Sequence, residues 1–213
     1  MEISRYGESA IRILFGDSIN VDINAQVRKF YFYIKSLAKK EIIDVIPSFC
    51  SCIIIFDNRL ISFAQLVSDL QEKEQEMNCV DLPDSKILDV PVEYGGVNGS
   101  DMGFVSSYAG LSVEEIIAIH TATIYTVFAV GFLPGFVYLG PLDPRLCVPR
   151  LETPRVRIPE GSVGLAQMQT GIYPFESPAG WRIIGRTKEQ LFNYRNEPFS
   201  RLQIGDRVKF GQI

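Results

Sequence analysis

The feature that most constrains this fold is a long passage, from Ile116 to Leu142, that contains no Asp, Glu, Lys or Arg. An apolar segment of about 20 residues is long enough to cross a lipid bilayer as a helix. This passage is interrupted by threonines, by His120 and by glycines and a proline between Gly131 and Gly140. These residues divide it into a short helix, an extended piece and a turn, and lipid would leave the freed backbone groups unpaired. We therefore expect a passage through the core of a globular domain, with a membrane helix as the alternative.

The composition is typical of a folded globular protein. The 213 residues are 46% hydrophobic and 22% charged, and this length accommodates one large domain or two small ones. The 21 Lys and Arg residues are outnumbered by 25 Asp and Glu residues, which gives a formal net charge of −4. Because no overall positive field is available to attract a phosphate backbone, we expect no nucleic-acid partner.

The cysteines and the N-terminus favour a cytoplasmic protein. Cys50, Cys52, Cys79 and Cys147 do not form the even, closely spaced framework that is typical of small secreted domains. The residues after Met1 lack the basic region, apolar stretch and cleavage site of an export signal, and no lipidation motif follows. We therefore expect a protein that is neither secreted nor anchored to a membrane.

The first part of the chain alternates between strand-like and helix-like periodicity. Segments rich in β-branched residues precede segments whose apolar residues recur at helical spacing. If the last strand is included, the order βαββαβ is the split βαβ arrangement of a small ferredoxin-like domain. The expected strands cover residues 10–15, 42–49, 52–56 and 87–92, and the expected helices begin at Asp22 and cover residues 62–76.

A polar segment divides the chain into two expected domains. Residues 72–86 are rich in Glu, Gln, Asp and Asn, which is typical of a domain boundary. We therefore expect one domain over residues 1–86 and a second over residues 87–213. In the second, Ser112 and Glu115 form a capping box that starts a short helix. Beyond this helix, short apolar runs separated by glycine and proline favour an all-β barrel or sandwich, so the predicted class is α+β.

His120 is the sole histidine in the chain and is therefore the natural candidate for a general acid or base. The structural alternative is that it interacts with the last carbonyl groups and the negative end of the helix dipole. Cys147 could pair with it as a nucleophile, although a buried structural role is commoner for cysteine. With a single histidine a Cys/His zinc set is hard to assemble, so we expect no metal site.

The densest chemistry lies in four loops rich in glycine, proline and arginine. Glycine and proline fix the backbone, and arginine supplies forked donors suited to a carboxylate or a phosphate. The alternative is that glycine and proline only turn the corners of a barrel, and that the arginines pair with the chain's own acids. Neither a phosphate-binding loop nor a dinucleotide fingerprint is present in the sequence. The loops are residues 131–140, 149–163, 169–174 and 177–182, and the arginines are Arg150, Arg155, Arg157, Arg182 and Arg186.

These loops resemble the KipI family, also known as the allophanate hydrolase subunit 1 family, which includes the B subunit of the bacterial ATP-dependent 5-oxoprolinase. The matching motifs extend from Val90 to the C-terminus, and the N-terminal part agrees in length and pattern. The motifs are Gly131-Phe-Leu-Pro-Gly-Phe-Val-Tyr-Leu-Gly140, the two Pro-Arg pairs, Gly161-Ser-Val-Gly164, Gln169-Thr-Gly-Ile-Tyr-Pro174, and Trp181 with Gly185-Arg-Thr187.

The resemblance implies a ferredoxin-like N-terminal domain followed by a cyclophilin-like β-barrel domain. It implies that the chain helps to open the lactam of 5-oxoproline to glutamate, with ATP as co-substrate of a complex. The implied partners are the C subunit, which is similar to KipA or allophanate hydrolase subunit 2, together with the A subunit. In this scheme His120 would handle a proton, and six residues would bind substrate or phosphate: Arg155, Gln169, Thr170, Tyr173, Trp181 and Arg186.

The resemblance leaves two other functions open. KipI inhibits a sensor histidine kinase, so the barrel could instead be an interaction surface for such a kinase. A role in the cleavage of allophanate is the third possibility. The chain also departs from the family pattern inside the loops, where added side chains or a fixed dihedral angle can change loop shape and substrate fit. The departures are Pro141, Glu160, Gln167 and Ala179.

Overall fold

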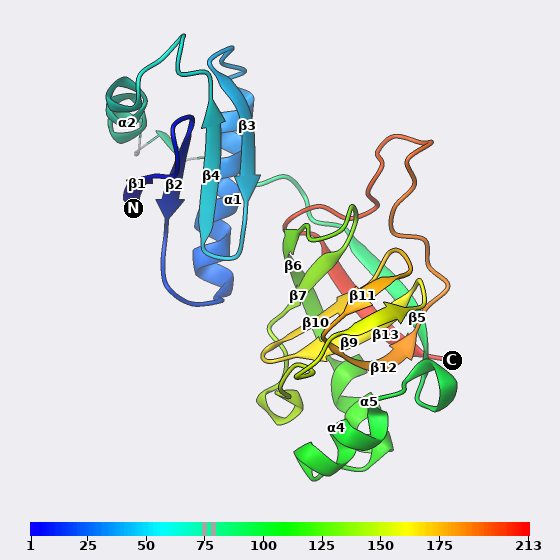
Figure 1. The fold of residues 1–213 in the computed structure, drawn as a ribbon. Helices are drawn as coiled ribbons and strands as arrows, with labels where there is room; N and C mark the ends of the chain where they lie inside the picture. The colour runs from blue at the N-terminus through cyan, green and yellow to red at the C-terminus, as the bar shows by residue number, and fades with distance from the viewer. Residues whose placement is uncertain (74–75, 78–79) are drawn as a thin grey trace. The chain divides into compact units, whose positions relative to one another are not determined.

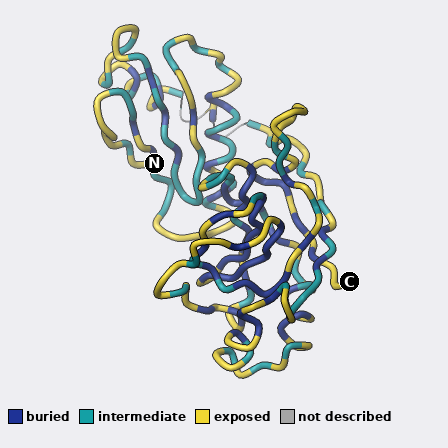
Figure 2. Tube along the Cα trace, turned by 45° about the vertical axis from the view of Figure 1, so that its right-hand side comes forward, coloured by how far each residue is buried: buried dark blue, intermediate teal, exposed yellow. Residues whose placement is uncertain are grey.

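The computed structural model describes residues 1–73, 76–77 and 80–213. The chain divides into two compact units, Met1–Asp84 and Ser85–Ile213, which run from blue to cyan and from green to red in Figure 1. Each unit has a buried core of its own, drawn in dark blue in Figure 2. Cys79 and the expected helical residues 74 and 75 lie outside the described residues.

Over residues 1–73, the N-terminal unit is a four-stranded antiparallel sheet with two helices (Figure 1). The strand order is β1-β2-β4-β3. Every expected helix and strand before residue 73 is present, with bounds that differ by a few residues. The strands are β1 (Glu2–Arg5), β2 (Ala10–Leu14), β3 (Ile42–Pro47) and β4 (Ser51–Phe56), and the helices are α1 (Val21–Ser36) and α2 (Phe63–Glu72).

One face of this sheet is apolar because side chains alternate along each strand. In β4, Cys52, Ile54 and Phe56 are at most 1% exposed, whereas the residues between them are only half-buried. Phe30 of α1 and Leu66 of α2 belong to the same buried cluster. The helices therefore cover the apolar face of the sheet and remove it from water.

The strand expected over residues 87–92 does not complete this sheet. Those residues lie in β5 (Ile87–Tyr94), which belongs to the second unit. The edge of the N-terminal sheet beside β2 is formed instead by β1, which pairs with β2 in an antiparallel register. The strand β1 was not predicted, because four residues with a single apolar side chain, Ile3, are too few to show a period of two.

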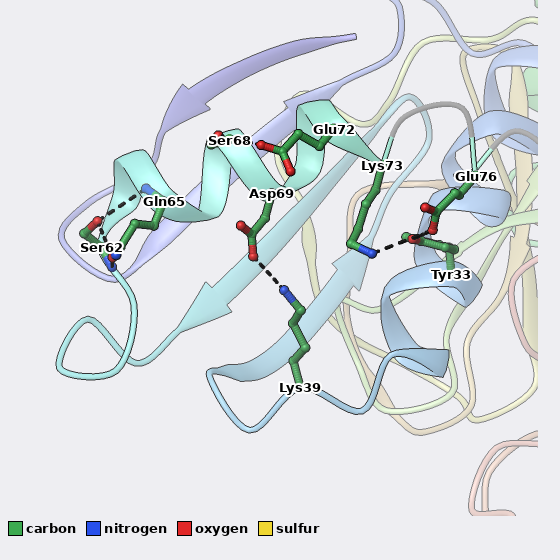
Figure 3. Close-up of polar contacts among 9 residues, drawn as sticks. All are labelled: Tyr33, Lys39, Ser62, Gln65, Ser68, Asp69, Glu72, Lys73 and Glu76. Carbon is green, nitrogen blue, oxygen red and sulfur yellow. Dashed lines mark hydrogen bonds and ion pairs between the residues drawn. The ribbon is translucent and has the colours of Figure 1, made fainter.

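Polar contacts fix α2 in place (Figure 3). The hydroxyl of Ser62 accepts a hydrogen bond from the Gln65 backbone N–H at 3.3 Å, and the Gln65 amide oxygen accepts one from the Ser62 backbone N–H at 3.0 Å. This reciprocal pair satisfies two donors that the first turn of a helix leaves free. An ion pair of 2.7 Å between Lys39 and Asp69 connects the helix to the loop before β3.

Replacing Ser62 with alanine should destabilise the N-terminal unit by about 1 kcal/mol, because the helix loses its capping hydroxyl. Hydrogen exchange of the buried β2 and β4 amides would measure the loss. Ser68→Ala is the matched control, since Ser68 lies on the exposed side of the same helix. Equal effects of the two substitutions would contradict a specific contribution of the cap.

The second unit is a closed seven-stranded barrel, accompanied by two α-helices, two short 3-10 helices (Gly96–Asn98 and Pro144–Leu146) and a separate two-stranded sheet. The barrel order is β10-β7-β6-β13-β5-β12-β9, and pairing of β9 with β10 closes it. The expected barrel is thus present, and it is compatible with a cyclophilin-like architecture. Its remaining elements are α4 (Met102–Ala109), α5 (Val113–Ala122), β6 (Ile124–Val130), β7 (Val137–Gly140), β8 (Arg155–Ile158), β9 (Ser162–Ala166), β10 (Gln169–Ile172), β11 (Ser177–Ala179), β12 (Arg182–Arg186) and β13 (Arg207–Gln212).

The charge-free passage is divided among α5, β6 and β7. Tyr125, Val127 and Val137 are fully buried in the barrel core. Helix α5 begins at the predicted capping box of Ser112 and Glu115. In the described part of the chain, no single helix is long and apolar enough to span a membrane, and α4 and α5, bent by 91°, pass that test only as a pair.

Candidate functional site

A pocket of about 350 Å³ opens on the second unit, a volume within the range of small-molecule sites. Most of its wall is apolar or aromatic, and Arg150 is the single charged residue that lines it in the part of the chain that the structure describes. The lining residues are Phe132, Phe136, Tyr138, Arg150, Leu151, Pro154, Tyr173, Pro178, Ala179, Gly180 and Trp181. Two of the residues expected to bind substrate, Tyr173 and Trp181, are therefore part of this pocket.

One face of the barrel wall carries the pocket, and the opposite face lines the barrel interior. Successive side chains on a strand point to opposite faces, and β10 shows this division. Thr170 is fully buried and contacts His120 inside the barrel. Gly171 faces the other way, since a Cβ built on it would lie 3.0 Å from the Trp181 ring. Gln169 shares the face of Gly171, because it is two residues away on the same strand.

Trp181 packs against a pair of glycines on the barrel wall. Gly164 of β9 and Gly171 of β10 are direct cross-strand partners. A Cβ at Gly164 would lie 3.1 Å from Trp181 Cβ, and one at Gly171 would lie 2.8 Å from the Val137 carbonyl oxygen. A side chain at either position would displace the indole or the neighbouring strand, so the glycines allow the close approach.

Aromatic rings surround the pocket. The ring centroid of Phe136 lies 4.7 Å from Tyr138, 4.8 Å from Tyr173 and 5.5 Å from Trp181, each in edge-to-face geometry. Burial raises the pKa of the Tyr138 and Tyr173 phenols above the ordinary value. Both hydroxyl groups therefore stay protonated at neutral pH.

Arg150 is held beside this aromatic cluster. Its guanidinium carbon lies 5.8 Å from the centroid of the Trp181 ring, within the range of a cation–π contact. The Leu151 backbone N–H donates to the Gly180 carbonyl at 2.8 Å, and Arg182 Nε donates to the Pro149 carbonyl at 3.3 Å. The residues before and after Arg150 in the sequence are thus hydrogen-bonded to the residues that flank Trp181.

Arg155, expected to bind substrate, is engaged by an acid of the chain itself. Its two terminal nitrogens donate to the two carboxylate oxygens of Asp101 at 2.7 and 2.8 Å. The Asp101 side chain is 6% exposed, and it also accepts a hydrogen bond of 2.7 Å from the Ile183 backbone N–H. This arrangement matches the alternative that the arginines neutralise internal acids, and sequence analysis did not identify Asp101.

The other expected arginines also have polar partners. Arg157 forms an ion pair of 2.6 Å with Glu176, and Arg186 Nε donates to the Glu160 carbonyl at 2.8 Å. Arg186 lines a separate, smaller hollow of about 120 Å³ with Glu93, Asn98, Thr187 and Lys188. The structure therefore does not bring Arg155 and Arg186 together around the aromatic pocket.

His120 is fully buried inside the barrel rather than in the pocket. Its Nδ1 lies 2.7 Å from the Tyr94 hydroxyl, and its Nε2 lies 2.9 Å from the Thr170 hydroxyl. Thr170 donates its own proton to the Gly164 carbonyl at 3.1 Å, so it must accept from His120. This assigns the proton to Nε2 and makes Nδ1 the acceptor of the Tyr94 hydroxyl. Burial lowers the pKa of His120 to about 3, which keeps the ring neutral.

Gln169 is 6% exposed. Within the described residues, its amide Nε2 is buried without a hydrogen-bond partner. An unsatisfied buried donor costs about 1–3 kcal/mol, and Gln169 is not among the residues that line the aromatic pocket. The same strand thus carries an unpaired donor on one face and the fully paired Thr170 on the other.

The departures from the family pattern have local structural roles. Ala179 lines the aromatic pocket, and the Glu160 carbonyl accepts the Arg186 hydrogen bond. Gln167 follows β9 with a φ of 53°, in the left-handed region that glycine adopts more readily. Its backbone N–H donates to the Val148 carbonyl at 2.7 Å, which holds the turn in this conformation.

Within residues 1–73, 76–77 and 80–213, no group of three or more His, Cys, Asp or Glu side chains is arranged to hold a metal ion. Cys50 is partly buried, Cys52 is buried and Cys147 is exposed. Cys147 therefore does not share the sealed interior in which His120 lies.

The sole histidine of this chain should not titrate in the folded protein between pH 8 and pH 5. Its folded pKa of about 3 lies below the ordinary value of about 6.5, so the unfolded chain binds the proton first as pH falls. The contribution of His120 to stability is full above pH 6.5 and falls by about 1.4 kcal/mol per pH unit toward pH 3. One imidazole resonance, followed by NMR, measures this pKa, and a midpoint near pH 6.5 would contradict a sealed ring.

Removing the Asp101 carboxylate should destabilise the second unit by about 3 kcal/mol. Asp101→Ala leaves Arg155 and the Ile183 N–H without their partner, and breaking a buried ion pair typically costs about 3–5 kcal/mol. Since the Arg155 side chain is 33% exposed, the lower end of that range applies. Urea unfolding followed by fluorescence of Trp181, the single tryptophan, reports on this unit.

Glu176→Ala is the control for that measurement, because it removes a carboxylate from an exposed pair with Arg157. Such pairs contribute less than about 1 kcal/mol. A loss after Asp101→Ala that is no larger than the loss after Glu176→Ala would show that Asp101 does not anchor the barrel.

Comparisons with known proteins identify relatives across nearly the whole chain. The sequence profile described as carboxyltransferase domain, subdomain C and D, matches residues 1–202. The 5-oxoprolinase B subunit of Bacillus subtilis is 37% identical over 222 residues, covering 100% of this chain and 92% of that protein. The corresponding B subunit of Haemophilus influenzae is 38% identical and covers 87% of this chain and 86% of that protein.

A solved structure agrees with these matches. The crystal structure of TTHA0988 superimposes with a TM-score of 0.84 at 30% identity, covering 96% of this chain. The chain spans 39% of the length of TTHA0988. The resemblance of the sequence to the KipI family is therefore confirmed by relatives that share both sequence and fold. The chain belongs to the family of the carboxyltransferase domain, subdomain C and D, together with the bacterial 5-oxoprolinase B subunits.

Proposed function

We propose that this chain is the B subunit of an ATP-dependent 5-oxoprolinase and that its aromatic pocket contributes to the substrate site. The observation that carries the proposal is the 37–38% identity, over most of the chain, to proteins named as the B subunit of 5-oxoprolinase. The pocket on the second unit is of a size for a small molecule. The proposed function is therefore based on the similarity to these B subunits, and the proposed position of the substrate site is based on the size and lining of the pocket.

The reaction opens the lactam of 5-oxoproline to glutamate. A lactam carbonyl is a poor electrophile, so transfer of the γ-phosphoryl group of ATP to its oxygen, with departure of ADP, would activate it. One water molecule then opens the ring by breaking the C–N bond, and a second releases phosphate. The nitrogen leaves as the amine of glutamate. This chain would bind and orient the ring, since burial of a reactant in a preorganised site lowers the entropic cost of the reaction.

The predicted site residues take different parts in this proposal. Tyr173 and Trp181 would contact the substrate, because both line the pocket. Gln169 does not line the pocket and would act from behind it, where its amide Nε2 is buried without a partner among the described residues. His120 and Thr170 would be positioning residues, since their hydrogen bonds connect helix α5 to the carbonyl of Gly164 behind Trp181.

The two arginines expected at the site, Arg155 and Arg186, would have different roles. Arg155 would act indirectly, through Asp101 and the strand that follows Trp181. Arg186 is exposed and would bind phosphate or carboxylate only at the separate hollow beside Lys188. We assign no phosphate-binding loop to this chain, and ATP would be bound with the help of partner subunits.

The proposal includes the organisation implied by the family. In the cytoplasm, the chain would act with two partners, the A subunit of 5-oxoprolinase and a C subunit that is similar to KipA or allophanate hydrolase subunit 2. The N-terminal domain, residues 1–86, would be ferredoxin-like, an assignment supported by its two helices on an antiparallel sheet. The second domain, residues 87–213, would be the cyclophilin-like barrel.

The test is release of glutamate and ADP from 5-oxoproline and ATP. The chain is assayed alone, and then co-purified with candidate A and C subunits. We expect turnover only in the complete complex, because this chain does not carry the whole site. In that complex Trp181→Ala should lower kcat/KM at least about tenfold, since removing a buried aromatic contact costs more than about 1.4 kcal/mol.

Tyr194→Ala is the control for this assay, since Tyr194 is 69% exposed and does not line the pocket. Its turnover should match that of the unsubstituted complex. A stable complex with no turnover would overturn the proposal, and binding to a sensor histidine kinase would then be the next activity to measure.

A further inference from the structure

Arg150 has an unusual position among the five arginines of the glycine- and proline-rich loops and the strand after them. Arg155, Arg157, Arg182 and Arg186 each make a hydrogen bond or ion pair with another group of the chain. Arg150, by contrast, makes no hydrogen bond or ion pair among the described residues, and its guanidinium lies beside the ring of Trp181. Its forked donors are therefore available to a ligand.

The backbone on both sides of Arg150 is fixed. Hydrogen bonds from Leu151 to Gly180 and from Arg182 to Pro149 join its loop to the segment that carries Trp181. Asp101 in turn holds that segment through the Ile183 backbone N–H. The backbone that carries Arg150 is therefore positioned beside the pocket before a ligand arrives, while the exposed side chain contacts the Trp181 ring. Less backbone entropy is lost when Arg150 binds a ligand.

The lining of the pocket defines the chemistry of its ligand. Arg150 is the charged member of the lining, and no carboxylate is among the lining residues that the structure describes. The rings of Phe136, Tyr138 and Trp181 offer apolar surface for a compact ring, and guanidinium groups bind carboxylates through two parallel hydrogen bonds. A small ring that carries one carboxylate matches both features.

We propose that Arg150 binds the carboxylate of a small cyclic monocarboxylate whose ring packs against Trp181. This inference deepens the proposed function and rests on it for the identity of the ligand, 5-oxoproline. It assigns substrate specificity to the first Pro-Arg pair of the loops, whereas Arg155 of the second pair supports the wall through Asp101. The neutral lactam without the carboxylate would lack the contact with Arg150.

The test uses the full chain and the fluorescence of Trp181, the single tryptophan, which lies in the pocket. The protein is titrated with 5-oxoproline and, separately, with 2-pyrrolidinone, which is the same lactam without a carboxylate. Arg150→Gln should weaken binding of 5-oxoproline about tenfold to a hundredfold, since charge-assisted hydrogen bonds are lost. It should leave binding of 2-pyrrolidinone unchanged within about twofold.

Arg157→Gln is the matched control, because it removes the same charge from a nearby strand, β8, at a residue that does not line the pocket. We expect it to leave both affinities unchanged. Equal weakening by Arg150→Gln and Arg157→Gln would indicate a general effect of net charge and overturn the assignment. Unchanged affinity of the Arg150→Gln protein for 5-oxoproline would also overturn it.

The same variants, assembled with the A and C subunits, separate this inference from the proposed function. Arg150→Gln should raise the KM for 5-oxoproline about tenfold or more, with a smaller change in kcat. Turnover of the Arg150→Gln complex with an unchanged KM would contradict the role of Arg150 but would still support the oxoprolinase assignment. Binding of 5-oxoproline that depends on Arg150, in a complex without turnover, would support the role of Arg150 and overturn the oxoprolinase assignment. Absence of both binding and turnover would overturn both.

Discussion

The buried carboxylate of Asp101 is the interaction on which the site depends. It binds both terminal nitrogens of Arg155 and the backbone N–H of Ile183, while its own N–H donates to the Ile183 carbonyl. Asp101, at the start of α4, thereby fixes both β8 and β12. The pocket residues Tyr173 and Trp181 lie between these two strands in the sequence. The positions of Trp181 and Arg150 follow from this anchoring, because their neighbours are joined to each other and to β12.

Much of the fold was predictable because its signals are local. Strand-like runs rich in β-branched residues predicted β2 and β4, and the Ser112 capping box predicted the start of α5. The assignment of residues 87–92 to the first sheet was wrong, since an isolated strand does not specify its partner. Those residues pair in parallel with β13, more than a hundred residues later, and a pairing of that range leaves no trace in local periodicity.

The site was predictable only where a residue's type determined its role. Trp181 and Tyr173 were identified because they belong to the motifs that resemble the KipI family, and both line the pocket. Arg155 and Arg150 each follow a proline, and nothing in the sequence tells which of them meets an internal acid. His120 was chosen for its ordinary pKa, but burial, a property of the folded state, lowers that pKa.

The pairing of β13 on both of its edges has a consequence for synthesis of the chain. β13 lies between β5 and β6 in the barrel, so the barrel cannot close until Arg207–Gln212 has left the ribosome. The N-terminal sheet needs no residue beyond its own unit and can fold while translation continues. During that interval β5 and β6 lack the strand that lies between them in the finished barrel, so the backbone groups along one edge of each strand are open to pairing with another chain.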